Sequence, residues 1–489
     1  MDNGINRREF MGASGMGAVC MSSLMQPVIA RAGLAFPPLG KGKTKTRVGK
    51  IYLGNPHPGW PKVTVDLEAE KKQYEDEFAK LASALEDIEF VGGAIVSTPE
   101  QLQAALGQFK DIDGILALHL TMGAGSHFES LLKLNEPIVF FTPLYAGHEW
   151  HTIASRQKKG EKIVVLPSGN YGDLATAVRP FRAIHRLKEA KILYVNVNPH
   201  DGKYAEMIRN KFGTQIKHID CPTMIKYYEA VPDGDTAKEA ERWTKEAEKI
   251  VEPSKEEIFE SSKMYLAMKN LIEAEQADVI TINCLGLFSR GLPDAYPCFG
   301  FSRLSSDGLG GICEADLKST MTHLIFQSLS GKPGFVSDPV VDLSNNTIIH
   351  AHCVAPLKMD GVDGESCPYI IRSHLEDGKG ASLFVRMKIG QKISMARLIG
   401  DGIMLFSTGE IVDTPYVDRG CRTKITTQVK DAQKMLENWS CGLHRVIFYG
   451  DLTNDVRRFC RFKDIRLVME GEENLFNVPG LEWEPYIHA

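Results

Sequence analysis

The sequence predicts a mixed α/β protein, with two Rossmann-like α/β domains followed by a mainly β C-terminal domain. Three observations support this fold class. Short apolar runs alternate with helical patterns over 48–180, the alternation restarts over 181–333, and short strand-like runs dominate 334–489. The chain has 489 residues, of which 43% are hydrophobic and 24% are charged, as expected for a globular protein of several domains.

The first α/β domain, 48–180, is recognised by strands that alternate with helices. Apolar runs of strand length occur at 50–53, 90–95, 114–120, 138–141 and 162–167. Helical patterns cover about 67–85 and 99–109, and the second of these opens with a Thr-Pro-Glu start signal. Helices between successive strands predict a mostly parallel sheet that is covered on both faces.

The same alternation returns in the second domain, 181–333. Strands are expected at 191–197, 215–219 and 278–284, and helices at 202–212, in much of 235–275, and at 315–330. The charged stretch 238–255 is interpreted as a solvated helix face rather than a binding surface.

The third domain, 334–489, is marked by short β-like runs with turn signals between them. These runs lie at 347–353, 381–388, 392–399, 402–407, 410–412 and 445–449. One late helix is expected at about 426–438. The change in pattern predicts a mainly β domain at the C-terminus.

The N-terminus carries a twin-arginine export pattern. The motif NRREFM (6–11) holds the paired arginines, an uncharged stretch rich in glycine and methionine follows, and Ala-Arg-Ala at 30–32 fits a small-x-small cleavage site. We therefore expect residues 1–32 to be a signal peptide for periplasmic export through the twin-arginine machinery. An uncleaved membrane anchor and a chance Arg-Arg pair before an ordinary helix are the alternatives.

Charge and cysteine content narrow the classes of function. A net charge of −5 gives no support for a nucleic-acid partner or for binding to an anionic membrane surface. The ten cysteines include no C-x-x-C pair, so zinc-ribbon and thioredoxin chemistry are not indicated. Cysteines within apolar runs, such as Cys284 and Cys353, are expected to be buried thiols. Small-molecule chemistry is therefore favoured.

The common motifs of nucleotide binding and serine catalysis are missing. The first strand leads into GNPHPG (54–59) rather than G-x-G-x-x-G, and Gly-Ala-Gly at 123–125 lacks the third glycine, so no NAD site is predicted. The sequence has no P-loop and no G-x-S-x-G elbow. Hydrolysis by two carboxylates stays open in principle because acids are plentiful, but no spacing singles out a pair of them.

Two acids stand on either side of the expected helix 315–330. Glu314 closes a glycine-rich run, and Asp338 follows the apolar stretch 334–336 at an expected strand end. His444 lies just before the strand-like run 445–449. Two carboxylates and an imidazole suit a hard or borderline divalent cation. Each also has an ordinary explanation, as a helix-dipole acid, a turn acid and a core-edge histidine respectively.

Three segments around these residues resemble one enzyme family. The first, 301–356, contains Cys-Glu-x-Asp at a helix start, Ser-Asp after a Gly-Lys-Pro turn, and His-Cys-x-x-Pro. The others are LIGDGIMLFSTGEIVDTP (398–415) and CGLHRVIFYGD (441–451). Together they resemble the L-fucose isomerase and L-arabinose isomerase superfamily, in particular its fucose-isomerase-like members. The likeness is best over 277–455, and over 48–190 only the α/β pattern agrees.

The resemblance implies a metal-dependent aldose–ketose sugar isomerase. Glu314 and Asp338 match the family's two acids and His444 its metal histidine, and His352 is a further candidate ligand. The metal is usually Mn²⁺, and the acids also carry the proton that moves between C1 and C2 through a cis-enediol. Because the family forms trimers or hexamers, a homotrimer or homohexamer is expected.

Candidate sugar contacts lie in two other segments. Ser306 and Asp307 stand in the glycine-flanked loop before Glu314. His148 and Trp150, in Gly-His-Glu-Trp (147–150), combine an aromatic face with polar groups, as sugar sites often do. The family resemblance adds that His148 could act across a subunit interface. The alternative for this segment is a surface turn beside a buried Trp150.

Two other classes of function are also considered. A periplasmic sugar-binding protein without catalysis would share the two α/β units and the export signal, although the extra β domain argues against it. An exported NAD(P) oxidoreductase is disfavoured by the missing glycine fingerprint.

Overall fold

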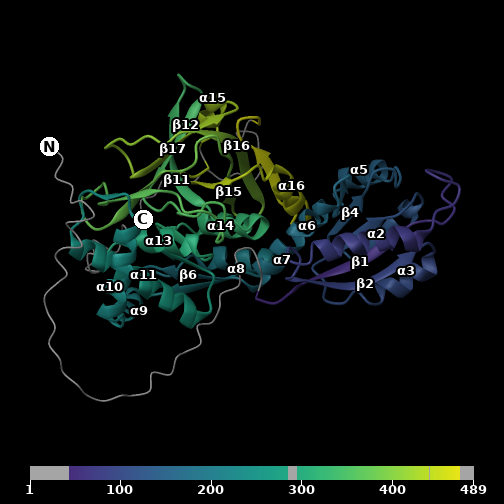
Figure 1. Cartoon of the computed structure of the whole chain (residues 1–489), viewed down its shortest axis with the longest axis horizontal. Helices are drawn as coiled ribbons and strands as arrows, with labels where there is room; N and C mark the ends of the chain where they lie inside the picture. The colour runs from purple at the N-terminus through teal and green to yellow at the C-terminus, as the bar shows by residue number, and fades with distance from the viewer. Residues whose placement is uncertain (1–42, 285–294, 440, 474–489) are drawn as a thin grey trace, which may run out of the picture.

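The computed structural model describes residues 43–284, 295–439 and 441–473 (Figure 1). The chain has two parallel-sheet units and a C-terminal antiparallel β-barrel, which confirms the predicted order of a mixed α/β region followed by β structure. The expected signal peptide, 1–32, lies outside the described residues. Within the described ranges, no helix has both the length and the apolar character needed to cross a membrane.

The first parallel-sheet unit contains five strands in the order β2-β1-β3-β4-β5, and all of its strand pairs are parallel. The strands are β1 (Thr46–Leu53), β2 (Ile88–Val96), β3 (Gly114–His119), β4 (Ile138–Thr142) and β5 (Ile163–Pro167). The helices are α2 (Leu67–Lys80), α3 (Pro99–Leu106), η1 (Ala124–His127), α4 (Phe128–Leu132), α5 (Trp150–Lys158), η2 (Tyr171–Asp173), α6 (Leu174–Ala177) and α7 (Arg179–Glu189).

Helices cover both faces of the first sheet, as the alternation predicts. Successive residues of a strand point to opposite faces, and on β1 they enter two separate hydrophobic clusters. Tyr52 packs in the cluster that includes side chains of α2 and α7. Ile51 packs in the cluster that includes side chains of α3, α4 and α5. The sheet is therefore a buried layer, and polar function is left to its edges.

The second parallel-sheet unit contains four strands in the order β10-β9-β6-β7. The strands are β6 (Lys191–Val195), β7 (Gln215–Ile219), β9 (Val279–Ile282) and β10 (Gly310–Cys313). The helices are α8 (Gly202–Phe212), α9 (Cys221–Glu229), α10 (Asp233–Glu246), α11 (Lys255–Glu275), α13 (Cys298–Ser306) and α14 (Leu317–Ser330).

The C-terminal unit is an antiparallel barrel of six strands in the order β15-β18-β11-β12-β17-β16, closed by the pairing of β15 with β16. A seventh strand, β19, runs parallel to β16 beside the barrel. The strands are β11 (Phe335–Asp342), β12 (Thr347–His352), β15 (Lys392–Ile399), β16 (Ile403–Asp413), β17 (Thr423–Val429), β18 (Arg445–Tyr449) and β19 (Arg466–Met469). Its helices are α15 (Ala432–Glu437) and α16 (Thr453–Phe462).

A small three-stranded sheet connects the second unit to the β region. Its order is β14-β13-β8, with β13 (Tyr369–Arg372), β14 (Ser382–Val385) and β8 (Lys249–Ile250). The strand β8 lies between α10 and α11 in the chain and pairs in parallel with β13. The connection therefore rests on backbone hydrogen bonds as well as on side-chain packing.

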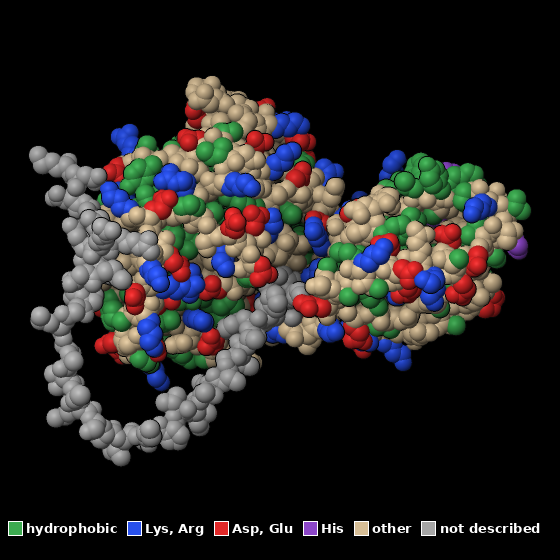
Figure 2. All heavy atoms as spheres, viewed as in Figure 1, with side chains coloured by type: hydrophobic (Ala, Val, Ile, Leu, Met, Phe, Trp, Pro, Cys, Tyr) green, Lys and Arg blue, Asp and Glu red, His purple; other side chains and the backbone are tan. Residues whose placement is uncertain are grey.

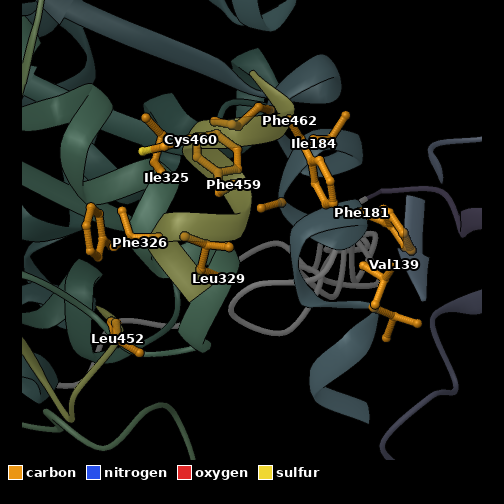
Figure 3. Close-up of a cluster of buried hydrophobic side chains, with 14 of the residues drawn as sticks. Val139, Phe181, Ile184, Ile325, Phe326, Leu329, Leu452, Phe459, Cys460 and Phe462 are labelled. Atoms are coloured by element: carbon orange, nitrogen blue, oxygen red, sulfur yellow. The ribbon is translucent and has the colours of Figure 1, made fainter. Parts of the chain in front are cut away.

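One hydrophobic cluster runs through all three units (Figure 3). Phe181 of α7 stacks on Phe462 of α16, with ring centroids 6.0 Å apart. Phe326 of α14 stacks on Phe448 of β18 at 4.9 Å. The expected boundary at 180/181 falls inside α7, so this helix carries packing contacts to both sides of it.

Three sequence expectations differ from the structure. The helix expected at about 426–438 is present but starts later than expected, because the β-branched run of β17 continues to Val429 and the helix α15 covers only Ala432–Glu437. The two runs expected at 402–407 and 410–412 form one strand, β16, with a bulge between Ile411 and Asp413. Asp338 is not at a strand end, since β11 continues through Asp338 and Pro339. The proline is tolerated there because β18 pairs with β11 only as far as Ser337.

The face shown in Figure 2 carries acidic and basic side chains interspersed over all three units. Hydrophobic side chains gather on the first unit near α5 (Figure 2). The exposed large hydrophobic residues of this part of the chain are Trp60, Val63, Leu144, Tyr145 and Trp150. We call these five residues the N-terminal apolar patch.

Candidate metal centre

Four residues expected to bind metal come together where the second unit meets the barrel. Nε2 of His444 lies 3.3 Å from Oε2 of Glu314 and 3.2 Å from Oδ1 of Asp338. Nε2 of His352 lies 3.4 Å from Oε1 of Glu314 and 3.9 Å from Oδ2 of Asp338. Two carboxylates and two imidazoles therefore face the same small volume. We call these four residues the acid–histidine cluster.

The barrel register explains why three of these residues meet. The strands β18, β11 and β12 are neighbours, with Ser337 opposite Arg445 and Asp338 opposite Ala351. His444 directly precedes Arg445, and His352 directly follows Ala351. Because antiparallel partners lie side by side, Asp338 within β11 is placed between His352 at the end of β12 and His444 just before the start of β18. Residues 338, 352 and 444 are distant in sequence but close in the barrel.

Glu314 reaches the site from the second unit through an unusual turn. The strand β10 ends at Cys313, and the next two residues, Glu314 and Ala315, have φ of 61° and 52°. Residues with a side chain rarely adopt this left-handed conformation, which costs roughly 1–2 kcal/mol each. The turn aims the Glu314 carboxylate at the barrel and lets Asp316 begin α14 as its N-cap.

A second layer of polar residues supports His444. Oδ2 of Asp316 accepts hydrogen bonds from Nδ1 of His444 at 2.9 Å and from Nη1 of Arg397 at 3.0 Å. Neither Asp316 nor Arg397 is predicted from the sequence as a site residue. Asp316 carries a recognisable N-cap signal, an acid directly before a helix, whereas Arg397 has no local signal within its strand.

Burial and charge act in opposite directions on the acids. Burial alone would raise the pKa of Glu314, but hydrogen bonds from His352 and His444 lower it well below its ordinary value. Burial also opposes ionisation of Asp316, yet the charge of Arg397 and the His444 hydrogen bond hold its pKa well below normal. Both carboxylates are therefore ionised at neutral pH, as metal ligands and hydrogen-bond acceptors must be.

The two histidines are shifted the other way. Burial favours neutral rings, but the hydrogen bond to Asp316 and the facing carboxylates of Asp338 and Glu314 raise the pKa of His444 well above its ordinary value. The pKa of His352 is also raised, because its hydrogen bond to Glu314 and the charge of Asp338 outweigh burial. The site attracts positive charge, which a proton or a cation can supply.

The donor set fits a divalent cation. Ligands that share a cation at about 2.1 Å lie roughly 3.0–3.4 Å from one another, which matches three of the four nitrogen–oxygen distances. Nε2 of His444 is buried and has no well-aligned hydrogen bond among the described residues. Two overlapping groups of residues could hold a metal ion here. One is Asp338 with His352 and His444, and the other is Cys313 with Glu314 and His352.

Cys313 lies next to the acid–histidine cluster. Its Sγ lies 3.4 Å from Nε2 of His352. Burial and the charge of Glu314 raise the pKa of the Cys313 thiol well above its ordinary value, so the thiol keeps its proton. Since the thiolate is the metal ligand form, the carboxylates and imidazoles are the better donors. No disulfide joins any of the nine cysteines of the described residues, and Cys284 and Cys353 are buried as expected.

The other predicted contact residues lie elsewhere. Ser306 is buried and uses its hydroxyl to accept from the Leu357 backbone N–H and to donate to the Ser302 carbonyl. Asp307 is exposed at the end of α13 and accepts a hydrogen bond from the Tyr265 hydroxyl. Within the described ranges, neither residue has a hydrogen bond or ion pair with the acid–histidine cluster.

Trp150 is the first residue of α5 on the first unit, and His148 lies two residues before it; α5 lies away from the barrel strands in Figure 1. Trp150 is half exposed, so the alternative of a buried Trp150 is wrong. The His148 ring packs on Trp60, with ring centroids 4.5 Å apart. Both residues are accessible to an outside partner rather than to the site of their own chain.

No protein-family model matches the chain, and no curated protein matches its sequence.

The left-handed turn predicts the effect of a glycine at position 315. Ala315→Gly should raise the free energy of unfolding by about 0.5–1 kcal/mol, since relief of strain exceeds the entropy that glycine adds to the unfolded chain. Urea denaturation measures the change. The matched control is Ala247→Gly, at φ −71°, which should destabilise. A loss of stability at position 315 would contradict the strain.

The raised pKa values of the histidines predict coupling between cation binding and pH. A ligating histidine must give up its proton, so affinity for a divalent cation should rise with pH through the neutral range to the raised pKa of His444. Conversely, the stability that His444 gives the metal-free protein is complete below pH 6.5 and is lost as pH rises through that raised pKa.

Calorimetric titration with Mn²⁺ in buffers of different ionisation enthalpy measures the protons released. His444→Gln should reduce both the proton release and the pH dependence. Equal affinity at pH 6 and pH 8 in the wild-type protein would argue against cation binding at these nitrogens.

Proposed function

We propose that this protein is an exported, metal-dependent aldose–ketose sugar isomerase. The observation that carries the proposal is the convergence of Glu314, Asp338, His352 and His444. The resemblance to the L-fucose and L-arabinose isomerases supports it, because Glu314, Asp338 and His444 match that family's metal ligands, and His352 is a further candidate. Mn²⁺ is the proposed cation, since oxygen donors with added imidazole suit a hard or borderline metal.

The exposure of the four side chains supports a site that is open on its acidic side. Glu314 and Asp338 are 31% and 30% exposed, whereas His352 and His444 are 6% and 8% exposed. A sugar would therefore approach the carboxylates, with the rings forming the back of the site. This arrangement suits a reaction in which the acids contact the substrate directly.

The proposed mechanism assigns proton transfer to the carboxylates. Glu314 is ionised and can accept the proton from one sugar carbon. Asp338, which faces the same histidine, then takes over this proton and returns it to the neighbouring carbon, so that both acids end in the form in which they began. His352 and His444 hold the acids in place. A divalent cation bound by the four residues would stabilise the negative charge that builds up on the enediolate oxygens.

The first unit also supports a second candidate, sugar binding without catalysis. A cleft of about 380 Å³ opens beside the carboxyl ends of β3, β4 and β5, with Thr121, Tyr145 and Tyr171 among its lining residues. The order β2-β1-β3-β4-β5 reverses direction next to β1, where Rossmann-like sheets bind ligands. We therefore infer a Rossmann-like ligand edge, which in a sugar-binding protein would act alone.

The N-terminal apolar patch supports assembly into a homotrimer or homohexamer. His148 and Trp150 lie at this patch, and in a trimer they would reach the acid–histidine cluster of a neighbouring copy. The twin-arginine motif at 6–11 supports export of the folded chain to the periplasm. Such an enzyme would act on a small sugar outside the cytoplasm.

Substitution of the acids tests the proposed isomerase. Glu314→Gln or Asp338→Asn should lower kcat/KM for aldose-to-ketose conversion by about 10²–10⁴-fold, because each removes a proton carrier. The assay is ketose formation from a panel of aldoses with Mn²⁺ added, after elemental analysis of the purified protein.

The matched control is Asp342→Asn, on the same strand but in the exposed hairpin, which should keep full activity. Full turnover by Asp338→Asn would refute the mechanism. Tight sugar binding by a wild-type protein that forms no ketose would instead favour the second candidate.

The proposed assembly predicts a mass of three or six copies by light scattering. Tyr145→Ser with Trp150→Ser should shift the protein towards monomers, because it removes two exposed aromatic side chains from the patch. Val340→Ser, an exposed apolar residue on the barrel, is the control and should not change the mass. A fully active wild-type monomer would contradict the assembly.

A further inference from the structure

The carboxylate of Asp316 contacts both His444 of the acid–histidine cluster and the first residues of α14. Its Oδ1 accepts from the backbone N–H groups of Lys318 and Ser319, which caps α14. Its Oδ2 accepts from Nδ1 of His444 at 2.9 Å and from Arg397 at 3.0 Å. Oδ1 therefore caps the helix, whereas Oδ2 contacts His444 and Arg397. A substitution that changes only one of the two oxygens can distinguish these roles.

We propose that Asp316 is a positioning residue that fixes His444 as a metal ligand by holding the proton on Nδ1. An ionised carboxylate can only accept, so the ring nitrogen facing it must be the donor. The lone pair of a neutral ring then lies on Nε2, which is the nitrogen that faces Glu314 and Asp338. This inference rests on the metal site of the proposed function and adds the residue that selects the histidine tautomer.

The surroundings keep Asp316 in the form that the proposal needs. Arg397, whose side chain is 6% exposed, donates to the same Oδ2 as His444. The Ser319 hydroxyl donates to it as well, at 2.6 Å. The N-terminus of α14 adds a favourable dipole. Because all of these neighbours are donors or positive, the carboxylate is held with its acceptor lone pairs towards His444.

Asp316→Asn separates positioning from helix capping. Asparagine is an N-cap as good as aspartate, so its oxygen can stay on the Lys318 and Ser319 N–H groups. Its NH₂ group then replaces Oδ2 opposite His444. Facing a donor, the neutral ring must accept at Nδ1 and carry its proton on Nε2, where it blocks the cation. The helix is retained while the histidine presents the wrong nitrogen.

The experiment measures binding of Mn²⁺ by calorimetry and the visible absorption of the Co²⁺-loaded protein. Asp316→Asn should weaken Mn²⁺ binding by roughly 10–100-fold and alter the Co²⁺ spectrum, which reports on the bound imidazole. The matched control is Asp66→Asn, because Asp66 caps α2 with the same pattern of two backbone N–H groups. The control should leave both measurements unchanged.

A double-mutant cycle with His444→Ala distinguishes positioning from general damage. In that background Asp316→Asn should cause no further loss of Mn²⁺ affinity, since there is no ring left to orient. An equal loss with and without His444, or wild-type affinity in Asp316→Asn, would overturn the proposal. These readouts need no sugar, so a wild-type protein that binds Mn²⁺ but isomerises nothing would refute the isomerase and leave this inference standing.

Discussion

The structure depends most on the carboxylate of Asp316, where a parallel-sheet unit is joined to the barrel by hydrogen bonds. One oxygen satisfies the start of α14, and the other is shared by His444 and Arg397 of the barrel. This geometry requires the two preceding residues, Glu314 and Ala315, to adopt left-handed backbone conformations, which are unfavourable for residues with a side chain. Nitrogen–oxygen distances of 3.2–3.4 Å join the histidines to the acids in the cluster. The position of the turn at Glu314 is therefore closely constrained relative to the barrel strands.

The helix α14 gives this junction its rigidity. Every residue from Ser319 to Leu329 is buried, because the helix lies between the second sheet and the barrel. Its interior even includes His323, whose pKa burial lowers to about 4, so that the ring stays neutral at physiological pH. A helix buried all round cannot tilt without disturbing both neighbours. The cluster is therefore built on rigid elements, as binding sites that need exact distances usually are.

Local patterns in the sequence predict much of the fold and indicate Glu314, Asp338 and His444 as ligands, whereas His352 is a candidate only through the family resemblance. Strand–helix alternation and turn signals are properties of short segments, so they survive without knowledge of the tertiary structure. Arg397 cannot be found this way, because only the barrel register brings it beside Asp316. Asp316 is hidden for a different reason, since an acid before a helix is already explained as a cap. The pairing of β8 with β13 is a contact between distant segments, which no local pattern encodes.

The order of the chain has a consequence for how the protein is made. The two acids of the cluster are synthesised well before His444. Likewise, Phe181 of α7 is synthesised long before Phe462 of α16, on which its ring packs. A ribosome therefore releases the last donor only when the barrel is nearly complete. A chain that stops before residue 444 has Glu314, Asp338 and His352 but lacks His444, and it also leaves Phe181 of α7 without Phe462. The cluster can therefore be completed only after the chain has been made as far as the start of β18.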